Sequence, residues 1–142
     1  MSVRNKALVN DFISVIWNQN NFSVIDKYLH NGFIDHSLPS FLAPDKEGLQ
    51  NWISATGKSF QHITIIDEMV SEKDKVIIKI RMKLKHIGKW REIEATGTEI
   101  TTVGYRNFKL LNNKIIEHSA LIDGNAIESK LKEVQTHCKT QD

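Results

Sequence analysis

The strongest constraint on this chain is a strict alternation of apolar and basic side chains between Lys75 and His86. Every second residue from Val76 to Leu84 is apolar, and the positions between them are lysine or arginine apart from Ile77. A period of two is typical of a strand with one buried and one solvated face. The chain therefore contains a long strand that covers a core on one side only.

The segments around this strand divide the chain into an early helical part and a later sheet part. Before residue 60 the apolar residues recur with the spacing of amphipathic helices, and after it the period changes to two. Helices are predicted over 4–18, 23–30, 46–60 and 125–135, and strands over 62–71, 75–86, 97–111 and 114–122. Residues 33–44 are predicted to be a loop or extended segment, residues 90–95 a short strand or loop, and Asn112-Asn113 a hairpin turn.

Helices that precede strands joined by short turns predict an α+β fold with a mostly antiparallel sheet. Three helices packed on one curved sheet, with a short C-terminal helix after it, would close a cone. The inside of that cone is the natural place for a pocket, and we expect an apolar cavity between the first and third helices and strands 75–86 and 97–111.

The length of 142 residues fits one domain with one core. We expect residues 1–142 to form that domain, with 136–142 as a disordered tail. The 19 basic and 17 acidic side chains leave a net charge of +2, which argues against a dedicated nucleic-acid binder and a polybasic membrane anchor. The basic side chains of 75–86 are interpreted as a solvated face, because no aromatic residues are interleaved with them.

Cys138 is the single cysteine of the sequence, so an intrachain disulfide and an all-cysteine metal site are excluded. We expect its thiol to be exposed in the polar tail. The closely spaced His or Cys pairs typical of metal sites do not occur, so no metal site is expected. The sequence has no secretory signal and no apolar run that could span a membrane, which favours a cytoplasmic protein.

A series of short motifs, weak singly but specific in their order and spacing, resembles the SnoaL-like polyketide cyclases of the nuclear-transport-factor-2-like superfamily. The resemblance covers residues 7 to about 131. Its motifs are Trp17-Asn18, Phe33-Ile34-Asp35-His36, Asp74-Lys75-Val76, Thr96-Gly97, the segment from Asn113 to His118, and Asp123. It implies the cone-shaped fold of that superfamily and a pocket for a small apolar molecule.

The resemblance implies that Asp123 is the catalytic acid/base of a cofactor-independent reaction such as an aldol ring closure. Asp123 follows the apolar run Ala120-Leu121-Ile122, and a carboxyl group in an apolar pocket has a raised pKa that suits proton transfer near neutral pH. The alternative is that Asp123 caps the C-terminal helix, because Asp is a favoured N-cap residue. Both interpretations stay open on the sequence.

Three histidines are further candidates. His36 would orient substrate or tune the Asp123 proton, or else be a structural histidine at the mouth of the cone, and adjacent Asp35 and His36 should face opposite ways. His86 lies on the apolar face of its strand and is either a substrate-binding group or a hydrogen-bonded core residue. His118 should face away from Asp123, and we interpret it as structural or as part of a subunit contact.

The aromatic side chains complete the predicted site. The candidate lining or core residues are Trp17, Trp52, Phe33, Tyr105 and Phe108. The function implied is a cyclase or isomerase acting on a polyketide-like or other carbonyl compound. The alternative is a non-catalytic small-molecule-binding or protein-interaction module on the same fold, which the replacement of a family tryptophan by Ser119 favours.

A homodimer is also expected. The outer face of the sheet keeps Ile77, Val103 and Tyr105 among its charged side chains, and exposed apolar patches mark association surfaces.

Overall fold

A computed structural model describes the backbone of residues 2–141 and the side chains of residues 2–135. The elements are α1 (Ser2–Phe12), η1 (Ile13–Asn18), η2 (Phe22–Lys27), β1 (Leu29–Asp35), α2 (Lys46–Ser59), β2 (Phe60–Glu72), β3 (Lys75–His86), β4 (Glu99–Leu111), β5 (Lys114–Ile122) and α3 (Gly124–Gln141). Within the described part of the chain, none of the helices has the length and apolar character needed to cross a membrane. The expectations for a disordered tail and for the Cys138 thiol fall on residues outside those described in full, and they stay predictions.

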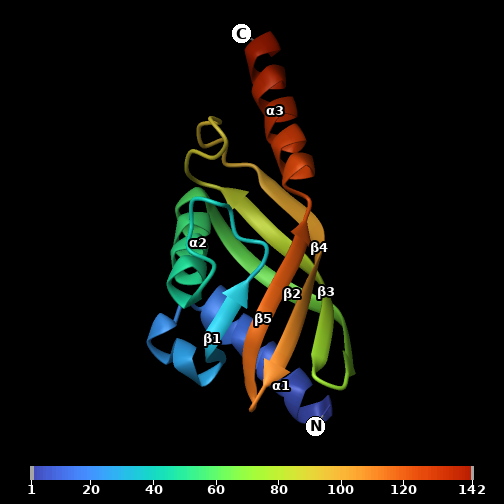
Figure 1. Ribbon diagram of the computed structural model, residues 1–142. Helices are drawn as coiled ribbons and strands as arrows, with labels where there is room; N and C mark the ends of the chain where they lie inside the picture. The colour runs from blue at the N-terminus through green and yellow to red at the C-terminus, as the bar shows by residue number, and fades with distance from the viewer. Residues whose placement is uncertain (1, 142) are drawn as a thin grey trace.

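One five-stranded sheet forms the body of the molecule, in the order β1-β5-β4-β3-β2. The pairs β2–β3, β3–β4 and β4–β5 are antiparallel, and β1 runs parallel to β5. The long strands cross the molecule side by side, with α1 against one end and α3 rising from the other (Figure 1). The predicted α+β class with a mostly antiparallel sheet is therefore confirmed.

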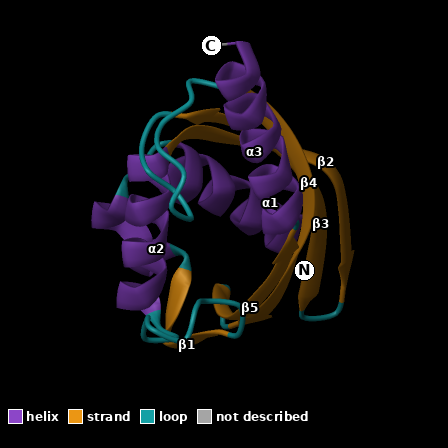
Figure 2. Cartoon of the chain, turned by 90° about the horizontal axis from the view of Figure 1, so that it is seen from above, coloured by secondary structure: helices purple, strands orange, loops and turns teal. Residues whose placement is uncertain are grey.

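The sheet curves strongly, and α2 stands opposite its long strands (Figure 2). Burial alternates along β4 without interruption, so one face of the strand packs inward and the other meets solvent. Among the fully buried inward side chains are Val76, Ile78 and Ile80 of β3 and Phe108 of β4. This curvature leaves an interior lined by both helices and strands.

The first predicted helix, 4–18, changes its geometry before it ends. The α-helix α1 stops at Phe12 and continues as the π-helix η1 from Ile13 to Asn18. The end of η1 is fixed by the Asn18 side chain, which accepts a hydrogen bond from the Thr64 backbone N–H at 2.8 Å and donates to its carbonyl at 3.0 Å. Single π-turns occur frequently at functional sites, and Trp17 lies within this one as a buried residue.

Residues 29–35 differ from the prediction. The second helix was expected to extend to residue 30, but a short 3₁₀-helix ends at Lys27 and Leu29 already begins β1. The Ile115 backbone N–H donates to the Tyr28 carbonyl at 2.7 Å and pairing with β5 continues to Asp35. Long-range pairing of this kind outweighs the weak helical preference of a short segment.

The hairpin turn predicted at Asn112-Asn113 is confirmed. Asn112 and Asn113 both have positive φ, 52° and 62°, and join β4 to β5, which is the geometry of a two-residue hairpin. Asp45 caps α2 by accepting a hydrogen bond from the Gly48 backbone N–H at 3.0 Å. The cap at Asp45 fixes where α2 begins, and the turn at Asn112-Asn113 fixes where β5 begins.

Candidate functional site

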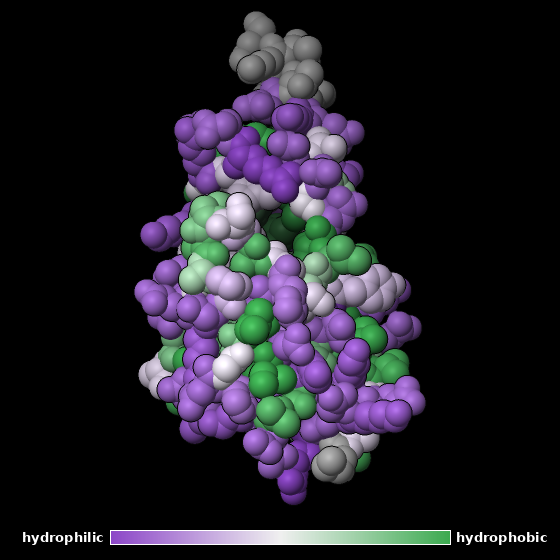
Figure 3. All heavy atoms as spheres, in the orientation of Figure 1, coloured by the Kyte–Doolittle hydropathy of each residue, from purple (hydrophilic) through white to green (hydrophobic). Residues whose placement is uncertain are grey.

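A cavity of about 280 Å³ opens between the sheet and the helices. On the surface, apolar residues surround a hollow below α3 (Figure 3). The cavity is lined by Trp17 of η1, by Trp52, Ala55, Thr56 and Ser59 of α2, by Phe60, Met82, Leu84, Trp90, Arg91 and Arg106, and by Ile122, Gly124 and Ile127. This main cavity lies where the sequence predicted one, and its volume is close to the lower limit for small-molecule sites.

All three tryptophans of the chain line the main cavity. Trp17 is 1% exposed and Trp52 is partly buried. Trp90 packs edge-on against Phe60 with ring centroids 5.3 Å apart. The wall is therefore suited to a flat, apolar or aromatic molecule.

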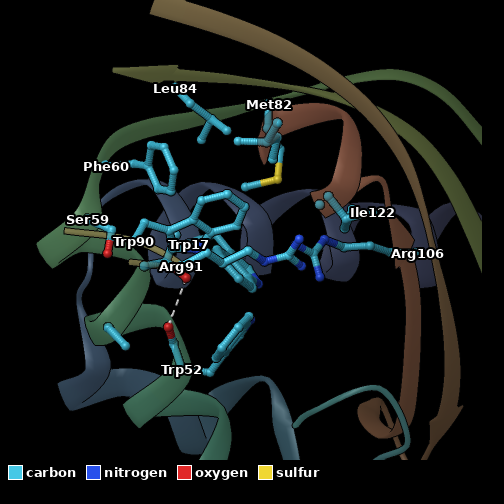
Figure 4. Close-up of a pocket in the computed structure, with 14 residues that line it drawn as sticks. Trp17, Trp52, Ser59, Phe60, Met82, Leu84, Trp90, Arg91, Arg106 and Ile122 are labelled. Carbon is cyan, nitrogen blue, oxygen red and sulfur yellow. Dashed lines mark hydrogen bonds between the residues drawn. The ribbon is translucent and has the colours of Figure 1, made fainter. Parts of the chain in front are cut away.

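Arg106 brings a charge into this apolar wall. It belongs to the inward-facing positions of β4, is 4% exposed, and its guanidinium carbon lies 4.3 Å from the centroid of the Trp17 ring. Burial lowers the pKa of Arg106 to about 10, against the opposing effect of Asp35. The side chain is thus a cation at neutral pH, and Figure 4 shows it reaching into the cavity.

A smaller chamber of about 170 Å³ adjoins the main cavity and shares Trp52, Arg106 and Ile122 with it. Its lining also includes the polar residues Ser37, Asp35 and His118, and the last two are buried. These two buried residues, with Arg106, form the Asp35–His118–Arg106 chain.

The carboxylate of Asp35 is fully bonded at its two oxygens. Oδ2 lies 2.7 Å from His118 Nδ1, and Oδ1 accepts from the Ser37 backbone N–H at 2.9 Å and from the Ser37 hydroxyl at 2.8 Å. Burial acts to raise the pKa of Asp35, but the hydrogen bonds from His118 and Ser37 outweigh it and hold that pKa below its usual value. Asp35 is therefore an anion in the folded protein.

The hydrogen-bond partners of His118 determine which of its ring nitrogens carries the proton. An arginine can only donate, so the 3.4 Å contact from Arg106 Nη1 requires an unprotonated Nε2. The proton then sits on Nδ1 and is donated to Asp35. Burial, supported by the charge of Arg106, lowers the pKa of His118. His118 is thus a neutral imidazole whose Nε2 lone pair faces the guanidinium.

The structure places Asp123 away from this arrangement. Asp123 is exposed, and its Oδ1 accepts the Ala126 backbone N–H at 2.9 Å in the first turn of α3. This is the capping geometry that the sequence left open as the alternative. The expected place in an apolar pocket is not observed, because the chain leaves the sheet after Ile122 and turns outward into the helix.

The two other predicted histidines also lie outside the cavity wall. His36 is about half exposed and its Nε2 lies 2.7 Å from Glu117. His86 is fully buried beside the Phe60 ring, and its Nδ1 accepts from the Thr96 backbone N–H. Burial lowers the pKa of His86. Both histidines therefore have structural partners of their own.

The predicted aromatic residues separate into three groups. Trp17 and Trp52 line the main cavity, as proposed from the sequence. Phe33 and Phe108 belong to the core, where Phe108 packs against the His118 ring at 5.0 Å between centroids. Tyr105 is 49% exposed on the outer face of the sheet and is not a lining residue.

Of the residues in the Asp35–His118–Arg106 chain, Arg106 has no role predicted from the sequence, Asp35 is predicted only to face the opposite way from His36, and His118 is interpreted as structural or as part of a subunit contact. Alternation was sufficient to find two of them: Asp35 has the parity of buried Phe33 in β1, and Arg106 has the parity of buried Phe108 in β4. The role of His118 depends on the pairing of Asp35 with it across β1 and β5, which no local pattern reveals. Among the described residues, no group of three or more His, Cys, Asp or Glu side chains is placed to bind a metal.

Comparisons with solved structures show the same fold at low sequence identity. AclR from Streptomyces galilaeus, described as a hydroxylase candidate, is 18% identical with a TM-score of 0.81, covering 94% of this chain and 98% of that one. A polyketide cyclase candidate from Acidithiobacillus ferrooxidans is 17% identical, with a TM-score of 0.81 and coverages of 92% and 96%. IdmH from Streptomyces antibioticus, described as a polyketide cyclase candidate, is 14% identical, with a TM-score of 0.81 and coverages of 90% and 98%.

The sequence itself settles the family. No curated protein sequence matches the chain. A family model described as SnoaL-like polyketide cyclase matches residues 7–131, which is most of the chain. The predicted nuclear-transport-factor-2-like fold is the one its structural neighbours share, and the chain belongs to the SnoaL-like polyketide cyclase family.

Proposed function

We propose that the protein binds a small carbonyl compound in the main cavity and catalyses a cofactor-independent proton transfer, with His118 as the acid/base. The observation that carries this proposal is the buried Asp35–His118 pair at 2.7 Å, in a chamber that shares three wall residues with the main cavity. A carboxylate that orients an imidazole is a recurrent arrangement for acid/base catalysis. The acid/base role is thereby moved from Asp123 to His118.

The protonation states support this role. His118 is neutral because burial lowers its pKa, so Nε2 can accept a proton at neutral pH. Asp35, ionised and bonded to Nδ1, stabilises the imidazolium that results. The contact that now occupies Nε2 is a long one, 3.4 Å from Arg106 Nη1, and a substrate C–H can replace it at little cost.

The reaction class is a cyclisation or an isomerisation. His118 Nε2 takes a proton from the carbon next to a carbonyl, which leaves an enolate. In a cyclisation the enolate carbon forms a bond to a second carbonyl carbon of the same molecule, and the resulting alkoxide takes the proton back from the imidazolium. No oxidant, reductant or second substrate is consumed.

The second candidate is a non-catalytic binding protein. The observation that favours it is Asp123, the residue implied as acid/base by family resemblance, which is an exposed helix cap here. Under this candidate the main cavity binds its ligand and the Asp35–His118 pair is purely structural. The cytoplasmic location expected from the sequence stays a prediction under both.

Proton exchange on a model ketone separates the two candidates. 2-Tetralone in D₂O is followed by NMR, and the enzyme-dependent exchange of its α-protons is measured for wild type, His118→Gln and Asp123→Asn. We expect His118→Gln to lose a factor of about 10² to 10⁴ in exchange rate, and Asp123→Asn to stay near wild type. Melting temperatures check that both variants fold.

Two results would decide against His118. The proposal fails if wild type exchanges no faster than buffer, and the non-catalytic candidate is then favoured if 2-tetralone nevertheless quenches tryptophan fluorescence. A rate loss confined to Asp123→Asn would restore Asp123 as the acid/base. If His118→Gln does not fold, Asp35→Asn, which removes the orienting charge, takes its place.

A further inference from the structure

We propose that the main cavity selects ligands that carry a carboxylate, held by the free edge of the Arg106 guanidinium. This inference rests on the proposed function in one respect, that the main cavity binds a small molecule. It adds the chemical class of that molecule. The predicted ligand is an anion with an apolar or aromatic body, and not simply an apolar compound.

The charge of the cavity wall supports an anion. The lining contains two guanidinium groups, those of Arg91 and Arg106, and no carboxylate. Both point into the cavity from opposite sides in Figure 4. In an apolar, water-poor site a fixed positive charge attracts an anion far more strongly than it does at the surface.

Arg106 has hydrogen-bond donors that the protein does not use. Among the described residues its guanidinium makes one hydrogen bond, from Nη1 to His118. Nε is buried and has no partner. With Nη1 engaged, the remaining edge carries the Nε and Nη2 donors, which form the planar fork that binds both oxygens of a carboxylate.

The nearest protein anion cannot take this place. The two oxygens of Asp35 are occupied by His118 and Ser37, and the His118 ring separates Asp35 from Arg106. A buried cation is costly unless it is paired and hydrogen-bonded. A carboxylate from the ligand supplies the direct partner that Arg106 lacks.

Trp17 provides a second unused donor in the same wall. Its indole Nε1 is buried without a partner in the described structure, and the Arg106 guanidinium stacks on its ring at 4.3 Å. Because this stacking covers one face of the guanidinium, ligand oxygens must approach its edge. That restriction favours a flat carboxylate over a tetrahedral anion.

Arg91 is a second cation in the cavity lining, and its side chain is 41% exposed. It donates to Asn125 Oδ1 at 3.0 Å and lies 3.9 Å from Glu128, so its position depends on α3. Arg91 and Glu92 both have positive φ, 47° and 64°. Residues other than glycine adopt this backbone conformation at a cost in free energy, and such residues are concentrated at functional sites. Arg91 therefore adds a positive charge to the lining that Glu128 offsets in part, so Arg106 remains the cation without a direct acidic partner among the described residues.

Isothermal titration calorimetry with two probes of equal shape tests the inference. 2-Naphthoate carries the carboxylate, and 2-naphthamide replaces it with a neutral group of the same size. We expect wild type to bind naphthoate at least tenfold more tightly. In Arg106→Gln this preference should fall to less than threefold while naphthamide affinity is kept. Arg106→Lys keeps the charge without the fork and should lie between the two.

The matched control is Arg81→Gln. Arg81 is an arginine on the outer face of the sheet, bonded to Asp67, and its loss should leave the naphthoate preference unchanged. Equal affinity for the two probes in wild type would overturn the inference and leave His118 catalysis untouched. A preference that survives in Arg106→Gln would also overturn it. If that variant fails to fold, Arg106→Lys decides instead, and a naphthoate preference as large as that of wild type would overturn the inference.

If neither naphthoate nor naphthamide binds to wild type, the inference is overturned together with the ligand-binding part of the proposed function. Failure of 2-tetralone exchange alone would leave carboxylate selection standing. The two experiments therefore fail separately.

Discussion

Asp35 and Arg106 carry opposite charges that stabilise each other across the His118 ring without touching. The perturbation that measures this coupling is a double-mutant cycle with Asp35→Asn, Arg106→Met and the double variant. Asparagine keeps the size of Asp35 and one acceptor oxygen for the two Ser37 donors, but it removes the charge, and its NH2 group cannot accept the His118 Nδ1 proton. Methionine fills part of the volume of Arg106 and suits the apolar contact with Trp17.

The expected magnitude follows from the geometry. The two contacts of 2.7 Å and 3.4 Å on either side of the imidazole put the charges on the order of 8 Å apart. At an effective dielectric constant of about 20, opposite charges at that distance attract by about 2 kcal/mol. Each single variant leaves one buried charge without its counterpart, which costs about 3–5 kcal/mol.

The assay is urea unfolding followed by circular dichroism at pH 7.5. We expect the double variant to be about 2 kcal/mol more stable than the sum of the two single losses predicts. Distant, independent sites add within about 0.5 kcal/mol. An additive cycle would refute the reasoning and show that Asp35 stabilises the fold only through its hydrogen bonds to Ser37 and His118.

Three further predictions concern other features. Burial lowers the folded-state pKa of His62, His86 and His118 below 6.5. As pH falls, these histidines therefore take up protons in the unfolded chain before they do so in the folded protein. The stability of the fold is complete above about pH 6.5 and is lost below it, by up to about 1.4 kcal/mol per pH unit per histidine. A melting temperature that rises as the pH is lowered from 6.5 to 5 would contradict this prediction. The Asp123→Ala variant should lose about 1 kcal/mol of stability in urea unfolding by removal of the α3 cap, and no loss at all would argue against the cap. The homodimer is predicted to associate through the outer sheet face, where Leu121 is 80% exposed. The Leu121→Lys variant should therefore convert the dimer to a monomer in analytical ultracentrifugation. A wild type that sediments as a 16.3 kDa species would contradict the predicted dimer.

The sheet was predictable from the sequence because its strands are long and one-sided. The alternation from Lys75 to His86 matches β3 residue for residue, and the asparagine pair at 112–113 marked a turn through its tolerance of positive φ. β1 was not predictable, because its pairing with β5 is a contact between distant segments. The π-helix that follows Phe12 was missed as well, since an apolar stripe does not distinguish it from an α-helix.

The cavity could be placed from the sequence, but its chemistry could not. Trp17 and Trp52 were identified from the inner faces of their helices. Asp123 was chosen because an apolar run precedes it, yet a carboxylate at a strand end can turn inward or cap the next helix, and only the backbone path decides between them. The sequence analysis placed His36, and not Asp35, at the pocket. The buried Phe33 lies two residues before Asp35, and this spacing indicates that Asp35 is the one that faces inward.

The parallel pairing of β1 with β5 has a consequence for how the protein folds. Asp35 and His118 are separated by 83 residues, so the contact between them forms only after nearly the whole chain is available. Such non-local contacts carry a large entropy of loop closure and slow the folding of the proteins that depend on them. During synthesis the imidazole can meet its carboxylate only once β5 has left the ribosome, so the activity proposed for this pair would report completed folding. A refolding experiment should accordingly recover helical signal before it recovers ligand binding.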